Sequence, residues 1–164
     1  MKQSLCAEYL RISDSEAAHL IEVATPAATS EGGTAGLVAQ GAEKLILDHF
    51  VRVAEADALD IDTDWESLLR TLTGNPLDGQ ALGDPLAEAI LGAERVCRAP
   101  MAAVIPAARV SEVLHTLSGI DLDARLADNG SQISQDRANQ RYRELVEFYT
   151  QTKESGAAVL VAIS

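Results

Sequence analysis

The end of the chain constrains the fold more than any other segment. Residues 157–163 read AAVLVAI, an unbroken apolar run in which Val159, Val161 and Ile163 are β-branched. The run is too short to cross a membrane, and Gly156 precedes it. A short apolar run of this kind predicts a strand that is buried on both faces. We therefore expect it to lie at the centre of a sheet.

The segment before this strand predicts the longest helix, from Ser134 to about Glu154. Its packing residues recur at helical spacing and are Tyr142, Leu145, Phe148 and Tyr149. At the other end of the chain, residues 4–12 alternate, with apolar residues on both faces. This pattern predicts a second strand that is covered on two sides. Ser13-Asp14-Ser15-Glu16 then forms a capping box, and Thr25-Pro26 is expected to end that helix.

The middle of the chain alternates between Gly-rich loops and helical patterns. Residues 27–41 are small and Gly-rich without a period, which predicts a mobile loop. Helices are expected over Glu43–Glu55, Trp65–Thr73 and Pro85–Leu91, and a strand is expected over Met101–Ile105. A further helix is expected to begin at Pro106. Its core face consists of Val110, Val113, Leu114 and Leu117. The fold class is therefore α+β: a helix-rich single domain over residues 1–164, with a small sheet that pairs the N-terminal and C-terminal strands.

Charge is distributed unevenly along the chain. The formal net charge is −12, and all of it arises in residues 1–94, because acids and bases balance in residues 95–164. A surface of this kind repels phosphate backbones, so we expect no nucleic-acid partner. The amino terminus lacks a long apolar run, and Cys6 and Cys97 form no CxxC motif. These features predict a soluble, cytoplasmic protein without a membrane segment.

The densest acidic run is Asp57, Asp60, Asp62, Asp64 and Glu66, which surrounds the only tryptophan of the chain. Asp60, Asp62 and Asp64 fit positions one, three and five of an EF-hand loop. Trp65 and Thr71, however, stand at positions six and twelve, where Gly and Glu are required. We expect no metal or other cofactor here, and a weak carboxylate site for Ca²⁺ or Mg²⁺ is the less favoured alternative. Thr63 and Glu66 instead match a capping box, and Trp65 begins an apolar stripe, which favours its burial.

Two further constellations are candidates for chemistry. Glu16–His19 and Glu112–His115 each form a Glu-x-x-His pair, the spacing that di-iron bundles use, although exposed side chains are the favoured interpretation. His49 is expected at the surface. Arg137 and Arg141 share one helix face and have the chemistry to hold a carboxylate or phosphate, with a solvated charged face as the favoured alternative. No catalytic motif is present.

A resemblance supports the fold. The segments DIDTDWESLLRTLTG and DPLAEAILGAERV, followed by IPAARVSEVLHTLSGI and LVEFYTQTKESGAAVLVAI, resemble the YfbM-like family of domains of unknown function. The strongest match is Trp65–Gly74. Ala93 stands where the family pattern has a second Gly, and Thr63 and Glu66 stand where Lys and His often flank the Trp. The resemblance implies a shared fold and carries no activity.

These observations lead to two hypotheses about function. The first is a non-enzymatic binding protein of the immunity type, which neutralises a toxin or another basic protein through an acidic surface formed by Asp57, Asp60, Asp62, Asp64 and Glu66. The alternative is a small-molecule or metal-dependent enzyme, with a pocket between the sheet and the 27–41 loop. The lack of a catalytic motif favours the first hypothesis.

Overall fold

The computed structural model describes residues 4–29, 44, 46, 48, 57–74, 84–97, 101–129 and 132–164. Its centre is an antiparallel five-stranded sheet with the order β2-β1-β5-β4-β3. The strands are β1 (Ala7–Ile12), β2 (Ala58–Asp62), β3 (Glu94–Cys97), β4 (Met101–Ile105) and β5 (Ala158–Ile163). The predicted α+β class and the pairing of the two terminal strands are confirmed.

The C-terminal strand β5 lies in the middle of the sheet, between β1 and β4. All six of its residues are buried. A hydrophobic core lies on each face of the sheet. The neighbouring strand β1 contributes Ala7 and Tyr9 to one core, and Leu10 and Ile12 to the other. Both strands are thus covered on two sides, as their apolar patterns predict.

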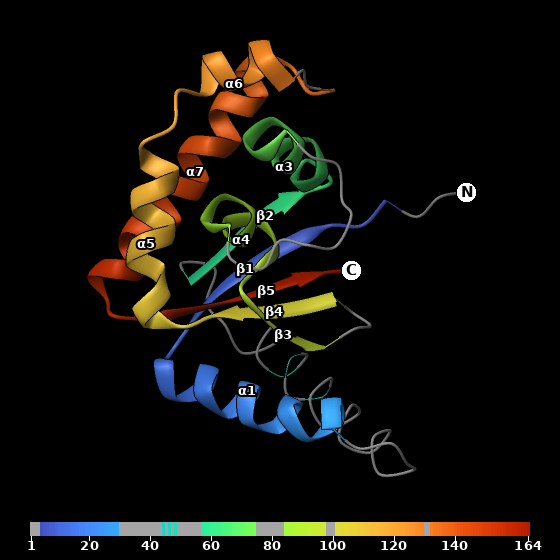
Figure 1. Cartoon of the computed structure of the whole chain (residues 1–164), viewed down its shortest axis with the longest axis vertical. Coiled ribbons are helices and arrows are strands. Elements are labelled where there is room, and N and C mark those ends of the chain that lie inside the picture. The colour runs from blue at the N-terminus through green and yellow to red at the C-terminus, as the bar shows by residue number, and fades with distance from the viewer. Residues whose placement is uncertain are drawn as a thin grey trace.

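Helices cover the two faces of the sheet unequally (Figure 1). The helix α1 (Asp14–Thr29) lies on one face, where Ala17 and Leu20 join a small core. The opposite face carries α3 (Trp65–Thr73), α4 (Pro85–Leu91), α5 (Ala107–Ser118), α6 (Leu122–Asn129) and α7 (Gln135–Glu154). The larger core lies between these helices and the sheet and includes the predicted stripes of α3, α5 and α7.

Several helix boundaries agree with their sequence signals. Ser13 Oγ accepts a hydrogen bond from Glu16 N at 3.1 Å, and Ser13 N donates to Glu16 Oε2 at 2.8 Å, so the first capping box is confirmed. Pro85 begins α4, and Gly74 ends α3 in the left-handed conformation with φ 75°. In the part of the chain that the structure describes, no helix is long and apolar enough to span a membrane.

Other expectations about the chain are wrong or fall outside the described residues. The helix α1 continues past Pro26 to Thr29, because a proline removes one backbone donor without preventing helical dihedral angles in the residues after it. Of the predicted 27–41 loop, residues 27–29 therefore belong to α1, and residues 30–41 lie outside the described part. Of the predicted 43–55 helix, Lys44, Ile46 and Asp48 are described as helical, and Ile46 is buried.

The acidic run forms a strand and a helix start that differ from the prediction. Leu59-Asp60-Ile61-Asp62 alternates and forms β2 at the edge of the sheet. The predicted Thr63–Glu66 capping box is wrong, because the cap residue of α3 is Asp64, which makes no side-chain capping bond. The strand β3 was also not predicted, since Glu94 and Arg95 at its start give it a polar character.

Candidate functional site

The structure distributes the five predicted partner-binding acids over three different environments. Asp57 Oδ1 accepts a hydrogen bond from Arg11 Nε at 3.3 Å, so a base of this chain already compensates it. Asp64 is only 5% exposed. Glu66 is exposed in the first turn of α3, and Asp60 and Asp62 lie on β2. The run is therefore not one continuous surface.

Asp64 is the buried acid of an ion-pair cluster. Its Oδ2 accepts hydrogen bonds from Arg137 Nε at 2.6 Å and from Arg141 Nε at 2.9 Å. Burial by itself raises the pKa of Asp64, but the hydrogen bonds and charges of the two guanidiniums outweigh it and hold that pKa below its ordinary value. The cluster joins the start of α3 to α7, and Asp64 is removed from any surface that a partner reaches.

Arg137 and Arg141 therefore do hold a carboxylate, as their spacing allows, and it belongs to this chain. Arg141 also donates through Nη1 to the carbonyl of Asp60 at 3.3 Å and to Glu144 Oε2 at 3.0 Å. The first of these bonds covers part of the outer edge of β2. An edge strand protected in this way is less prone to pair with another chain.

The remaining acids of β2 lie beside a glutamate that the sequence did not single out. Glu8 on β1 is directly opposite Asp60 on β2, so their side chains share a face of the sheet. Asp62 lies two residues after Asp60, where its main chain has φ 57° and its N–H donates to Asp60 Oδ1 at 2.7 Å. We call Glu8, Asp60 and Asp62 the acidic patch.

Within the described residues, no lysine or arginine side chain forms a salt bridge with the acidic patch. Partial burial raises the pKa of Glu8, and the negative charge of Asp60 raises it further. The thiol of Cys6 donates to Asp62 Oδ1 at 3.2 Å, and this hydrogen bond, followed by burial and the neighbouring carboxylates, raises the pKa of Cys6. The patch is thus a concentration of negative charge that the described part of the protein leaves uncompensated.

Trp65 does not belong to a contact surface. Its side chain is 4% exposed, and its Nε1 donates to the carbonyl of Leu5 at 2.9 Å. It packs in the larger core with Leu68, Leu69 and Leu72, which confirms the favoured interpretation that it begins a buried stripe. Trp65 is therefore not available for contact with a partner at the protein surface.

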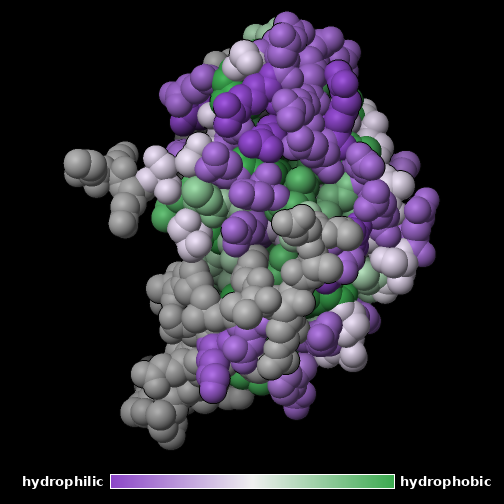
Figure 2. Space-filling view, turned by 180° about the vertical axis from the view of Figure 1, so that it is seen from behind, coloured by the Kyte–Doolittle hydropathy of each residue, from purple (hydrophilic) through white to green (hydrophobic). Residues whose placement is uncertain are grey.

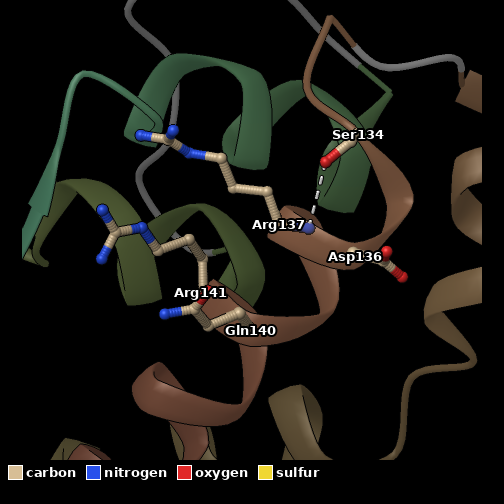
Figure 3. A pocket seen from close by; sticks show the side chains of 5 residues that line it. All are labelled: Ser134, Asp136, Arg137, Gln140 and Arg141. Atoms are coloured by element: carbon tan, nitrogen blue, oxygen red, sulfur yellow. Dashed lines mark hydrogen bonds between the residues drawn. The ribbon is translucent and has the colours of Figure 1, made fainter.

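A shallow depression lies beside the arginine cluster on α7. It has a volume of about 420 Å³ and is lined by Ser134, Asp136, Arg137, Gln140 and Arg141. Figure 3 shows both arginine side chains leaving the same side of α7, whereas Asp136 points to the other side of the helix. Hydrophilic residues cover this end of the molecule, where α6 and the start of α7 lie (Figure 2).

The Glu-x-x-His pairs are not assembled into a metal site. Glu16 is engaged in the cap of α1, and Glu112 pairs with Arg109, while His19 and His115 are exposed on different helices. No group of three His, Cys, Asp or Glu side chains in the described ranges is close enough to hold a metal ion. His49 lies outside those ranges, as do residues 30–41 of the loop that the enzyme hypothesis invokes.

A family model described as a domain of unknown function, DUF1877, matches residues 4–162. The chain belongs to the DUF1877 family. This membership covers nearly the whole sequence and agrees with the resemblance carried by Trp65–Gly74.

A solved structure shows the same fold as this DUF1877 member. The crystal structure of YfbM from Escherichia coli, a protein of unknown function, is similar with a TM-score of 0.63 at 19% sequence identity, over 97% of this chain and 99% of that chain. Among curated proteins, none matches the sequence. At this identity the likeness shows the fold alone, so any function must be argued from the residues of this chain.

Proposed function

We propose that this DUF1877 member is a non-enzymatic binding protein that neutralises a basic protein partner, as an immunity protein neutralises a toxin. The acidic patch is the contact surface in this proposal, with exposed Glu66 contributing to the attraction. The proposed location is the cytoplasm, so the partner is sought in that compartment.

The observation that supports the proposal is the position of Glu8 directly opposite Asp60 on neighbouring strands. Like charges in this arrangement repel and destabilise a sheet, and no described base compensates them. A basic side chain of a partner supplies the missing positive charge. It turns an unfavourable pair in the free protein into a favourable contact in the complex.

The distribution of the other acids supports the same surface. Asp57 and Asp64 are compensated by Arg11, Arg137 and Arg141 within the chain, so they contribute little to the field outside the protein. Glu8, Asp60 and Asp62 lack such compensation among the described residues. Uncompensated charges of one sign speed the encounter with an oppositely charged protein.

The proposal is tested by affinity purification from a native-cell lysate with the tagged protein as bait. The patch variant E8Q/D60N/D62N removes three negative charges and keeps the oxygen atoms that accept from Cys6 and Asp62. A control variant, E22Q/D128N/E154Q, removes the same charge from exposed positions elsewhere. We expect a basic protein to bind the unaltered protein and the control and to be lost from the patch variant. Equal retention by all three baits, or the absence of any enriched basic protein, contradicts the proposal.

A further inference from the structure

The guanidiniums of Arg137 and Arg141 use only part of their hydrogen-bonding capacity. An arginine has five N–H donors, arranged as a fork. Arg137 bonds Asp64 through Nε alone, so its Nη1 and Nη2 have no acceptor among the described residues, and the side chain is 49% exposed. Arg141 uses Nε and Nη1, which leaves Nη2 without a described acceptor.

Both side chains are nevertheless held in place. The two Nε atoms converge on the same oxygen of the buried Asp64, and Gln140 donates to Glu144 Oε1 at 3.0 Å beside them. A guanidinium that is fixed before a ligand arrives loses little side-chain entropy when the ligand binds. The depression of about 420 Å³ adjoins these donors, and every side chain that lines it is polar.

The charges around the depression disfavour a multiply charged anion, because two guanidiniums lie among three carboxylates, those of Asp64, Asp136 and Glu144. Asp64 is shared between the two guanidiniums, and Glu144 compensates Arg141 from the other side. Arg137 is therefore the less compensated cation of the two. Asp136 also lines the depression, although its side chain points away from the guanidiniums (Figure 3). With three carboxylates nearby, a phosphate dianion meets more repulsion than a carboxylate does.

We propose that the depression between Arg137 and Arg141 is a binding site for a carboxylate group, which the free Nη donors of Arg137 hold through paired hydrogen bonds. Such paired bonds match the geometry of a carboxylate and are stronger than neutral ones. This site uses none of the three carboxylates of the acidic patch, although Arg141 Nη1 bonds the main-chain carbonyl of Asp60. The failure of one proposal therefore leaves the other standing.

The probe is N-acetylglycine, which presents a peptide-like terminal carboxylate, and N-acetylglycinamide is its uncharged match. Each is titrated into the ¹⁵N-labelled full chain at constant ionic strength, and the Nε–Hε signals of both arginines are followed by NMR. We expect saturable shifts with N-acetylglycine and none with the amide. This comparison needs no variant. The absence of a saturable shift, or an equal response to the amide, overturns the proposal.

Variants and a second anion locate the site. R137Q should weaken N-acetylglycine binding about tenfold, the usual size of a lost charge-assisted bond. R143Q, which removes an exposed arginine from the same helix, should leave binding unchanged. If R137Q does not fold, R137K keeps the charge, removes the fork and should also weaken binding. An unchanged affinity in the folded Arg137 variant contradicts the site, and inorganic phosphate binding at least as tightly as N-acetylglycine contradicts its selectivity for carboxylates.

Discussion

Glu8 and Asp60 lie directly opposite each other on antiparallel strands, and no described base forms a salt bridge with either. Removing one of the two charges should therefore stabilise the protein. We expect E8Q to raise the free energy of unfolding by about 0.5 kcal/mol at pH 7, the usual size of a cross-strand pair. Urea unfolding of E8Q and of the control E22Q measures this difference, and E22Q should lie close to the unaltered protein.

The stabilisation in E8Q should depend on pH in a defined direction. The pKa of Glu8 is raised in the folded state by partial burial and then by Asp60. A carboxyl group whose pKa is higher in the folded than in the unfolded state binds its proton more tightly when the protein is folded. Its contribution to the free energy of unfolding is therefore fully present below the unfolded-state pKa and is lost as the pH rises through the folded-state pKa. E8Q should thus be the more stable protein at neutral pH and lose its advantage below about pH 4, where glutamate is protonated in both states. A difference that stays constant between pH 4 and pH 7 contradicts this account.

The charge of Asp64 should stabilise the protein at neutral pH, whereas the charge of Glu8 destabilises it. The reason is that the two arginine partners of Asp64 hold its pKa below the ordinary value despite burial. We expect D64N to cost about 2 kcal/mol at pH 7, less than a fully buried ion pair since Arg137 is half exposed. The stabilisation by Asp64 is present above its unfolded-state pKa of about 4 and is lost as the pH falls through the lower folded-state pKa.

Unfolding curves of D64N and the unaltered protein between pH 2 and pH 8 test this expectation. The variant D136N provides the control, because Asp136 lies on the same end of α7 but is exposed. D136N should change stability by less than about 0.5 kcal/mol, as a surface charge near a helix start does. If D64N and D136N have equal effects, the ion-pair cluster does not stabilise the contact between α3 and α7.

Gly92 and Gly156 both have a positive φ but differ in the space that surrounds them. Both have positive φ, 79° and 65°, but a Cβ at Gly92 would lie 2.6 Å from Ala103 Cβ, whereas nothing lies within 4 Å of one at Gly156. We expect G156A to cost about 1 kcal/mol from the left-handed conformation alone. G92A should cost about 3 kcal/mol, because Gly92 has φ 79° and ψ 170°, a conformation almost confined to glycine, and the clash with β4 adds to that backbone cost. Thermal unfolding of the two variants measures both values, and equal costs contradict the packing at Ala103.

The burial of Trp65 predicts a spectroscopic result. Trp65 is the only tryptophan of the chain, so intrinsic fluorescence reports on one site. Because the side chain is 4% exposed and bonds the carbonyl of Leu5, its emission should be blue-shifted and resist quenching by iodide until the protein unfolds. The control is the same measurement in concentrated guanidinium. Strong quenching in the native state would show that Trp65 is at the surface.

The parts of the fold that could be predicted are those whose sequence pattern is local. The apolar run at the C-terminus, the heptad-like stripe of α5 and the proline at the start of α4 depend on neighbours in the chain, and each was predicted correctly. The strand β2 was not predicted, although Leu59 and Ile61 alternate with Asp60 and Asp62, because aspartate is disfavoured in strands and Ile61 is the one buried residue of β2.

The candidate site was only partly predictable, since it depends on contacts between distant segments. The spacing of Arg137 and Arg141 predicted that they share a helix face, but the favoured interpretation of a solvated charged face is wrong, because both arginines bind the buried Asp64. Their partner Asp64 lies 73 residues before Arg137, and no local pattern indicates that pairing. Glu8 was missed for the same reason, because the register of β1 against β2 brings it opposite Asp60.

The central claim is that the acidic patch attracts a basic partner. The most direct test is the association rate of the purified partner from the lysate with the unaltered protein, with E8Q/D60N/D62N and with the control E22Q/D128N/E154Q. At low salt the patch variant should associate at least about tenfold more slowly than the control, and the difference should shrink at about 0.5 M salt, where surface charges are screened. Equal rates for the patch variant and the control at low salt would contradict the claim.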